Sequence, residues 1–331
     1  MAIPKSFRGK LKLPVVAAPM FLVSTPAMVI EACRAGIVGT FPALNQRTSE
    51  GFEEWLDEIQ AALTKDNIKT PFGVNLIVHR SNPRLQADLE ICIKKKVPLV
   101  ITSLGAVAEL VDAVQSYGGV VFHDVIKLRH AQKAAAAGVD GLIAVSAGAG
   151  GHAGLLNPLA WVEEIRQFFD GTILLSGTIS NGAQVAAAQA MGADLAYMGT
   201  RFINTTESAA PEHFREMIIE GRAEDIIYTP EVSGVHASFM RQSLEENGFD
   251  VDKLAGAGGK ADLKGVSDEA KAWKTVWSAG QGVGAIKDVP TTAELCARLK
   301  NEYFAAVESL SDSAAAYADN NKGDCLNGNH N

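Results

Sequence analysis

The sequence predicts a closed α/β barrel of eight strands and eight helices, (β/α)8, with an insertion after the eighth strand. Three observations lead to this expectation: eight short apolar runs, stretches with helical spacing between them, and no change in this alternation before residue 199. An open sheet with helices on both faces is the alternative, but it would change pattern where its strand order reverses. A length of 331 residues suits one closed barrel with an insertion.

The apolar runs are short and almost wholly apolar, as expected for strands buried on both faces of a parallel sheet. In chain order they are residues 14–18, 36–41, 72–77, 98–102, 119–123, 141–146, 172–176 and 195–199. The apolar stretch Leu13 to Val23, which contains the first run, follows four basic residues and superficially resembles a signal peptide. Because Pro14 and Pro19 interrupt it, we interpret it as a strand.

The segments between the runs have the spacing of amphipathic helices. In residues 52–63, for example, apolar side chains recur at steps of three and four. The phrases at residues 137–141 and 191–195 are near copies, Ala-Gly-Val-Asp-Gly and Met-Gly-Ala-Asp-Leu. Such copies are typical of the helix-to-strand returns of a repeated βα unit.

The alternation stops after Gly199. We expect residues 207–275 to be an insertion that covers the active site, and residues 1–206 with 276–310 to form the barrel. Residues 290–310 are expected to be the last helix, capped at Thr291 and Thr292. The polar, Asn/Gly-rich residues 311–331 are expected to be a disordered tail.

Composition excludes some classes of protein. A net charge of −8 argues against a general binder of nucleic acid or anionic membranes. No uninterrupted apolar run reaches the roughly 18 residues of a membrane span. The four cysteines are scattered, with no Cys-x-x-Cys pair, which indicates reduced thiols in a cytosolic protein. The sequence does not specify an oligomeric state.

The loops after strands seven and eight are rich in small residues. Gly177 and Thr178 follow strand seven, and Gly199 and Thr200 follow strand eight. Small residues let backbone N–H groups approach an anion, hydroxyls add donors, and the following helix N-terminus adds positive charge. Because barrels use this pair of loops for phosphate, we expect a phosphate site there.

Other strand ends carry candidate residues for catalysis and ring binding. His152 lies among small residues after strand six, where Gly150 and Gly151 could press backbone against a flat ring, and histidine suits proton transfer near neutral pH. Asn75 is an amide in an apolar strand, and a heteroaromatic ring edge or a backbone group would satisfy it. The backbone of residues 17–20 could lie along the same ring. His123 and His79 are also expected near the mouth.

Several common catalytic sites have no counterpart in the sequence. There is no metal-binding cluster, no Gly-x-Ser-x-Gly elbow, no Walker phosphate loop and no dinucleotide fingerprint at the first strand. Residues 148–151 match that fingerprint only loosely. Chemistry that depends on a bound cofactor is therefore favoured.

Six segments together resemble the nitronate monooxygenase family, formerly called 2-nitropropane dioxygenases, over about residues 10–308. They are residues 18–20 (Ala-Pro-Met), 71–76 (Pro-Phe-Gly-Val-Asn-Leu), 150–154 (Gly-Gly-His-Ala-Gly), 176–177 with 181–182 (Ser-Gly and Asn-Gly), 198–202 (Met-Gly-Thr-Arg-Phe) and 277–282 (Trp-Ser-Ala-Gly-Gln-Gly). The resemblance implies a TIM barrel with non-covalent FMN that oxidises alkyl nitronates with O2.

The resemblance also implies roles for individual residues. His152 would be the active-site histidine beside the flavin. The flavin ring and its sugar side would contact Ala18, Met20 and Asn75. Gln281 would close over the ring from the insertion. The phosphate would be held by Ser176, Gly177, Thr178, Gly199 and Thr200.

One position departs from part of the family. Some relatives that reduce quinones have His-Lys at the end of strand five, where this chain has His123-Asp124. A carboxylate there would disfavour an anionic dinucleotide and resist two-electron reduction of the flavin. An NAD(P)H-dependent quinone or enoyl-thioester reductase is the alternative enzyme, and a non-catalytic flavin- or phosphate-binding barrel is the alternative outside enzymes.

Overall fold

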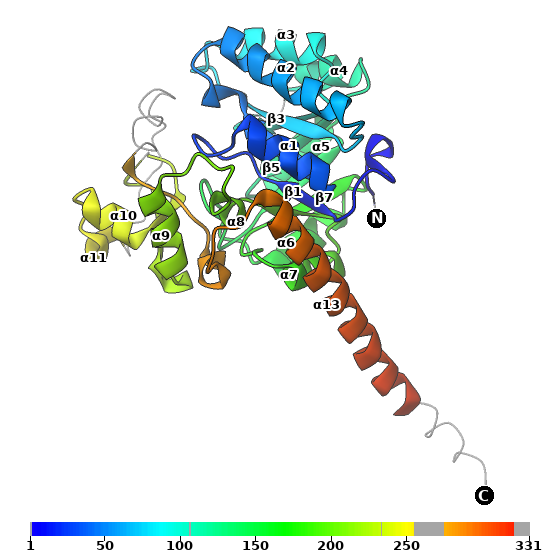
Figure 1. Ribbon diagram of the computed structural model, residues 1–331, viewed down its shortest axis with the longest axis vertical. Helices are drawn as coiled ribbons and strands as arrows, with labels where there is room; N and C mark the ends of the chain where they lie inside the picture. Colours follow the sequence, from blue (N-terminus) through cyan, green and yellow to red (C-terminus); the bar gives the residue numbers. More distant parts are fainter. Residues whose placement is uncertain (1, 106, 233, 255–274, 321–331) are drawn as a thin grey trace, which may run out of the picture.

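The computed structural model describes residues 2–105, 107–232, 234–254 and 275–320. Eight parallel strands pair in chain order within these ranges, and the eighth also pairs with the first (Figure 1). The expected closed (β/α)8 barrel is therefore confirmed. Cys325 and the end of the expected tail lie outside the described residues.

All eight expected strands are present, with ends within two residues of the expected ones. They are β1 (Val15–Ala17), β2 (Val38–Pro42), β3 (Phe72–Ile77), β4 (Leu99–Ser103), β5 (Val120–Val125), β6 (Gly141–Val145), β7 (Thr172–Ser176) and β8 (Leu195–Met198). Closure of the barrel pairs Val16 of β1 with Tyr197 of β8.

Helices surround the barrel. They are α1 (Pro26–Ala35), α2 (Ser49–Lys65), α3 (Leu85–Lys94), α4 (Ala108–Gln115), α5 (Leu128–Ala136), α6 (Pro158–Arg166), α7 (Gly182–Ala190) and α13 (Thr292–Asn320). Helix α13 packs between α7 and α1, so it completes the ring although the insertion precedes it. A short helix, α8 (Thr200–Ile203), follows β8 directly.

Alternation along the strands divides the core into two layers. Ile101, Phe122 and Ile143 belong to a cluster inside the barrel, while neighbouring strand residues pack against the helices. Phe7, in the 3-10 helix η1 (Lys5–Phe7), is buried in the interior cluster and meets the Phe122 ring edge-on at 6.1 Å. The segment before β1 thus packs into the core of the barrel.

The chain after β8 forms a separate group of elements beside the barrel (Figure 1). They are α9 (Glu212–Glu220), η3 (Ala223–Asp225), β9 (Ile226–Thr229), β10 (Ala237–Met240), α10 (Arg241–Glu246) and α11 (Val251–Leu254). Strands β9 and β10 pair antiparallel as a two-stranded sheet. Residues 275–280, here called the return segment, then lead to η4 (Gln281–Ala285) and back to the barrel.

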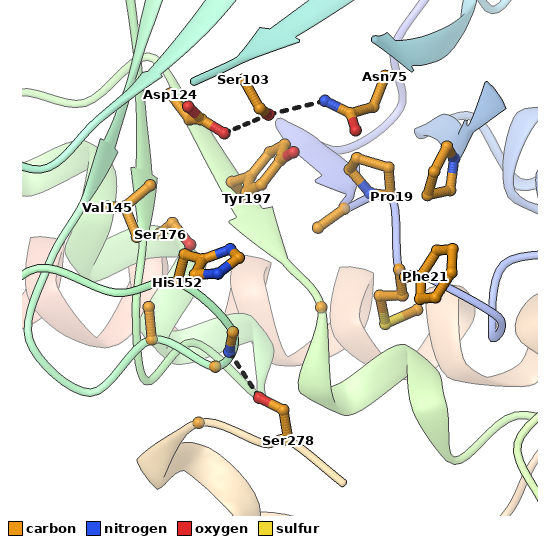
Figure 2. A pocket seen from close by; sticks show the side chains of 18 of the residues that line it. Pro19, Phe21, Asn75, Ser103, Asp124, Val145, His152, Ser176, Tyr197 and Ser278 are labelled. Atoms are coloured by element: carbon orange, nitrogen blue, oxygen red, sulfur yellow. Dashed lines mark hydrogen bonds between the residues drawn. The ribbon is translucent and has the colours of Figure 1, made fainter. Parts of the chain in front are cut away.

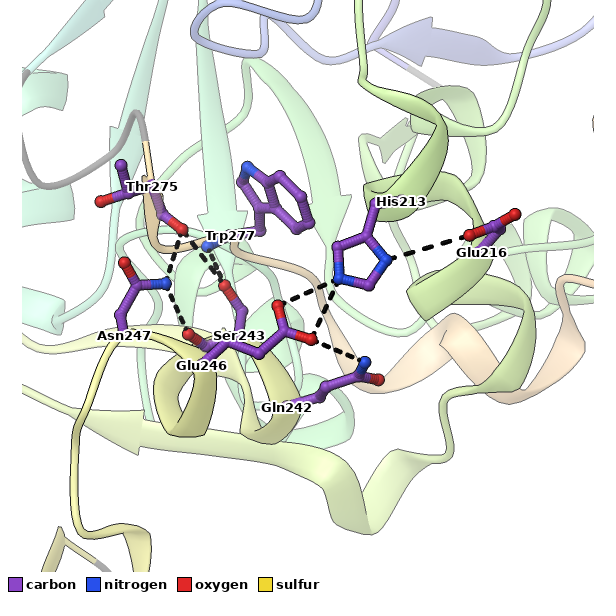
Figure 3. Close-up of polar contacts among 8 residues, drawn as sticks. All are labelled: His213, Glu216, Gln242, Ser243, Glu246, Asn247, Thr275 and Trp277. Atoms are coloured by element: carbon purple, nitrogen blue, oxygen red, sulfur yellow. Dashed lines mark hydrogen bonds and ion pairs between the residues drawn. The ribbon is translucent and has the colours of Figure 1, made fainter.

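The return segment is held by the elements beside the barrel (Figure 3). The Trp277 N–H donates to Ser243 Oγ at 2.8 Å, and the Trp277 carbonyl accepts from Met240 N at 3.0 Å. The Trp277 ring stacks on Phe214 with centroids 5.0 Å apart. The Asn247 amide donates to the Thr275 carbonyl at 2.8 Å. These contacts fix where the segment crosses the barrel mouth.

Helix α13 begins as expected but ends later. The Thr291 hydroxyl and amide both pair with Glu294, which caps the first turn. The helix continues to Asn320, beyond the end expected at residue 310. Residues 311–320 contain four alanines and neither Gly nor Pro, so their helix propensity outweighs their polarity. None of the described helices is both long and apolar enough to cross a membrane.

Candidate active site

A cavity of about 1720 Å³ opens at the carboxyl ends of the barrel strands. Loops after all eight strands line it, together with residues from α9, β9 and the return segment. Pockets for one small molecule measure about 300–1,000 Å³, so this cavity has room for a cofactor and a substrate together. Eleven of the expected site residues line it: Ala18, Met20, Asn75, Gly150, Gly151, His152, Ser176, Gly177, Thr178, Gly199 and Thr200.

The loop after β7 has the backbone of an anion site. Gly177 and Thr178 both have positive φ, 129° and 57°. Positive φ is costly for threonine, and such strain is typical of functional loops. Neither backbone N–H has an acceptor among the described residues. Both amides are therefore available to a ligand.

The first turn of α7 is not available to a ligand. Gln184 Oε1 accepts from Ser180 N at 2.6 Å, and Asn181 Oδ1 accepts from Gln184 N at 2.9 Å. Gly182 N donates to the carboxylate of Glu302 on α13 at 2.7 Å. The expectation that the helix after strand seven adds its N-terminal charge to the phosphate site is therefore wrong, because a carboxylate already occupies that position.

The start of α8 faces the same side of the cavity. A Cβ added at Gly199 would lie 3.6 Å from Ala18 Cβ and 3.7 Å from Met20 Sδ, which is ordinary contact. Thr200 Oγ1 accepts from Gly280 N at 2.9 Å, so its own O–H proton remains to be donated elsewhere. The loops after β7 and β8 and the return segment thus meet at one place.

The loop that carries His152 is clamped on both sides of that residue. Gly151 N donates to Ser278 Oγ at 2.7 Å, and Ser238 N on β10 donates to the Gly151 carbonyl at 2.9 Å. On the other side, the Tyr228 hydroxyl of β9 donates to the Ala153 carbonyl at 2.9 Å. Burial lowers the pKa of the His152 imidazole to about 4, so the ring is neutral at pH 7.

Opposite His152, polar side chains form the innermost layer at the barrel mouth (Figure 2). Asn75 Nδ2 donates to Ser103 Oγ at 2.8 Å, and the Ser103 hydroxyl donates to Asp124 Oδ2 at 2.5 Å. Burial raises the pKa of the Asp124 carboxyl to about 6, although the Ser103 hydrogen bond opposes this rise. Burial and the nearby Asp124 also raise the pKa of the Tyr197 phenol, so Tyr197 keeps its proton.

The rim of the cavity carries basic side chains. Arg47, Arg84, Lys127 and Lys133 all line it, from the loops after β2, β3 and β5 and from α5. Among the described residues, Asp124 is the only carboxylate in the lining. A rim of one sign attracts small ions of the opposite sign, so this mouth favours the entry of anions.

Comparison with known proteins identifies the chain. The family model of nitronate monooxygenase matches residues 5–302. The chain belongs to this family. A nitronate monooxygenase of Paraburkholderia phytofirmans is 26% identical and covers 90% of this chain and 94% of its own length. One from Pseudomonas aeruginosa is 26% identical and covers 88% of this chain and 96% of its own length.

Solved structures share the fold. Nitroalkane oxidase from Streptomyces ansochromogenes superposes with a TM-score of 0.79 at 23% identity, covering 92% of this chain and all of that one. FabK from Thermotoga maritima superposes with a TM-score of 0.75 at 23% identity, covering 92% of this chain and 96% of that one. Members of the nitronate monooxygenase family are flavin-dependent oxidoreductases, and this chain is therefore an oxidoreductase.

The lining of the cavity fits a flavin. The partnerless amides of Gly177 and Thr178, with the hydroxyl of Thr200, supply donors for a phosphate. Asn75 uses its amide NH2 group for Ser103 and the Ile101 carbonyl, which leaves its oxygen as an acceptor for a ring N–H. The backbone partner expected for Asn75 is thus present, and a ring partner remains a prediction. In the described residues, no group of His, Cys, Asp or Glu could hold a metal ion.

Two further histidines were expected at the mouth, and only His123 is among the residues that line the cavity. His123 is buried on the face of β5 opposite to Asp124, where its Nδ1 lies 2.7 Å from Thr102 Oγ1. It faces outward because Phe122 and Asp124 occupy the inward positions of a strand with period two. His79 pairs with Ser81 at 2.7 Å and does not line the cavity. His123 therefore lines the cavity from the outward face of β5, whereas His79 does not line it.

Gln281 is the one expected site residue outside the lining. Its backbone N–H donates to the Gly148 carbonyl at 2.9 Å, and its exposed side chain lies over Gly148. The residue therefore fastens η4 to the loop after β6. A contact from its side chain to a ring remains a prediction.

Ser103 and Tyr197 face into the barrel mouth, and neither was expected there from the sequence. Both stand at positions of period two with recognised strand residues, Ser103 with Ile101 and Tyr197 with Leu195. A polar side chain that continues the inward-facing series at the carboxyl end of a strand is the signal that could have found them.

Proposed function

We propose that this protein is an FMN-dependent nitronate monooxygenase, which oxidises alkyl nitronates with O2 to a carbonyl compound and nitrite. Membership of the family and the convergence of eleven expected residues on one cavity support this proposal. The observation that carries it is the pair of unpartnered amides, Gly177 and Thr178, beside the Thr200 hydroxyl. This set suits a single terminal phosphate and lacks a dinucleotide fingerprint.

The bound flavin would supply the electron transfer between nitronate and O2. The protein's own residues bind and orient the reactants. Because His152 is neutral at pH 7, we propose that it acts by donating an N–H hydrogen bond to the nitro group rather than as a cation. The clamp of Ser238, Ser278 and Tyr228 around its loop would hold that donor in place. Preorganised donors of this kind need no reorganisation during the reaction.

The substrate proposed here is an anion, and the rim of the cavity supports this. Arg47, Lys127 and Lys133 place positive charge at the rim, whereas the charge of Arg84 is paired with Asp88 at 3.0 Å. Lys127 and Lys133 form no ion pair with the described residues, so their charge is not locally neutralised. Raising the ionic strength should therefore lower kcat/KM for a nitronate more than for an uncharged substrate.

We also propose that the described part of the expected insertion, residues 207–254, covers the site together with the return segment; residues 255–274 lie outside the described residues. Phe214 and Tyr228 of the insertion and Trp277 of the return segment line the cavity. Apolar and aromatic groups there would exclude water from the reacting centre.

Identification of the cofactor is the first test of this function. Heat-released cofactor should co-elute with FMN on a column. Gly199→Val should abolish flavin retention, because its side chain would project toward Ala18 and Met20, where we expect the flavin to lie. Backbone strain would not confound the result, since Gly199 has an ordinary φ of −104°. Gly284→Val is the matched control, since Gly284 lies outside the lining in open space. Recovery of FAD, or equal retention of flavin by both variants, would contradict the proposal.

The basic rim also favours a second function, an NAD(P)H-dependent reductase of quinones or enoyl thioesters. Its cationic side chains could receive the phosphates of a dinucleotide or of another phosphorylated substrate. Anaerobic mixing with NADH separates the two functions. Rapid bleaching of the flavin supports the reductase, and persistence of the yellow colour supports the monooxygenase.

A further inference from the structure

Helix α13 extends well past the barrel (Figure 1). Its first turns pack between α7 and α1, and Cys296 and Leu299 are buried there. Beyond this contact, every residue from 307 to 318 is exposed. Short helices without packing partners are only marginally stable in water. Residues 304–320, here called the extension, are therefore a candidate surface for contact with another molecule.

The face of α13 that packs against the barrel continues along the extension. Five residues have the alternating spacing of four and three that forms the seam of a coiled coil, namely Tyr303, Val307, Leu310, Ala314 and Tyr317. Tyr303 packs against the barrel core, whereas the side chains of Leu310 and Tyr317 are 58% and 78% exposed. Cys296, seven residues before Tyr303, is buried. The packing face of the helix thus runs on into solvent as an apolar seam.

The charged residues of the extension lie away from this seam. Glu308 and Asp312 are one helical turn apart, and the 3.6-residue period places both on the side of the helix opposite to Leu310. The positions that flank the seam hold Phe304 and otherwise only alanine or serine. Two copies of the extension can therefore meet along the seam without bringing like charges together, and the small flanking residues let the helices approach closely.

Other features of the extension favour a second copy of this chain as the occupant. Residues 304–320 contain no Lys or Arg, whereas helices that lie on anionic membranes carry basic residues on their polar face. The match to the family model ends at residue 302, so the extension lies outside the part of the chain that the family shares. It also lies outside the lining of the cavity. Its role is therefore separate from the chemistry proposed for the barrel mouth.

We propose that the protein forms a two-fold symmetric dimer in which the extensions of two copies pair antiparallel along the seam. The orientation follows from the barrel, because the seam faces the chain's own barrel as far as Tyr303. A parallel partner would bring its own barrel into that space, whereas an antiparallel partner ends there. Val307 then lies opposite Tyr317 of the partner subunit, and Leu310 lies opposite Ala314 of the partner subunit. Each large side chain meets a smaller one, and the same contacts occur twice about the two-fold axis.

The size of the contact sets its strength. The extension is about 25 Å long at 1.5 Å per residue. With Phe304 and Tyr317 as the largest exposed side chains, two copies would bury on the order of 1,000 Å² in total, near the lower limit of specific interfaces. We therefore expect a reversible dimer, whose population rises with the protein concentration.

Sedimentation velocity of the full chain over a range of concentrations tests the proposal. The parent should change from monomer to dimer as its concentration rises. Leu310→Glu puts a charge into the seam and should raise the dimer dissociation constant by roughly 100-fold or more. Ser309→Glu is the matched control, since it adds the same charge beside the seam and should leave the dimer intact. Far-UV circular dichroism checks that both variants keep the fold, as expected for exposed positions.

Three outcomes would overturn the dimer: a parent that stays monomeric at every concentration, a dimer that persists in Leu310→Glu, or equal loss of the dimer in both variants. A monomeric parent that floats with phosphatidylcholine vesicles would assign the seam to a lipid surface instead. Amide hydrogen exchange gives a second readout, because protection of residues 307–318 should increase with dimer formation. Protection that does not depend on concentration would contradict the proposed contact.

Disulfide trapping tests the orientation. Val307→Cys and Tyr317→Cys are made separately in a Cys325→Ser background, where Cys33, Cys92 and Cys296 are buried. After mixing and oxidation, an antiparallel pair should link the two different variants, because only these positions lie opposite each other. Each variant alone should form little crosslinked product. Efficient crosslinking of each variant to itself would indicate a parallel pair and overturn the antiparallel arrangement.

Discussion

Replacing Asp124 with asparagine should stabilise the fold at high pH and have little effect at low pH. Burial raises the pKa of this carboxyl from an ordinary 3.8 to about 6 in the folded protein. Between these pH values the folded protein holds a proton that the unfolded chain has released. The stability contributed by the group is therefore present below about pH 4 and lost as the pH rises through about 6.

The difference in pKa sets the size of the effect. It corresponds to a loss of at most about 3 kcal/mol at pH 8. Asparagine has nearly the same shape and stays neutral, so it avoids this loss. We expect Asp124→Asn to gain up to about 3 kcal/mol over the parent at pH 8 and almost nothing at pH 3.5.

Urea denaturation of the flavin-free protein at both pH values measures this difference. Comparison between the two pH values cancels contributions that do not depend on protonation, such as altered packing or a weaker hydrogen bond from Ser103. A stability difference that is the same at pH 3.5 and pH 8 would refute the reasoning. A stability difference that shifts against the variant as the pH rises from 3.5 to 8 would refute it more strongly.

Three further predictions concern the site. Thr200→Val should raise the FMN dissociation constant about 10- to 100-fold, because it removes one hydrogen bond to a charged acceptor. Unchanged affinity in a fluorescence titration would place the phosphate elsewhere. His152→Ala should retain flavin but slow nitronate oxidation by about 10²- to 10⁴-fold; steady-state activity within twofold of the parent would exclude His152 from the reaction. Ser278→Ala, which releases Gly151, should lower kcat through the position of His152 while the flavin spectrum stays the same, and a change confined to flavin binding would argue against the clamp.

The fold could be predicted closely because its signals are local. Each barrel strand is buried on both faces, so each appears as a short apolar run between segments of helical spacing. The end of α13 was less predictable, since residues 311–320 are polar in composition but helical in propensity. The helix propensity of these residues indicates a helix, but their polar composition indicates a disordered tail, and the prediction followed the composition.

The site was predictable where its residues are neighbours in one loop. It was less predictable where the fold brings together residues that are far apart in the sequence. Gly177, Thr178 and His152 were found from small residues at strand ends. The carboxylate of Glu302 at the start of α7 comes from the far end of the chain, and nothing near residue 182 indicates it. The choice of Asp124 over His123 as the inward residue depends on strand register, which a single polar pair does not specify.

The most direct test of the account is oxygen uptake with propionate 3-nitronate in the absence of any nicotinamide cofactor. We expect rapid uptake with release of nitrite, and little consumption of NADH when a quinone is supplied in a parallel assay. Negligible uptake together with fast NADH turnover would contradict the assignment and identify the protein as a reductase on the same barrel.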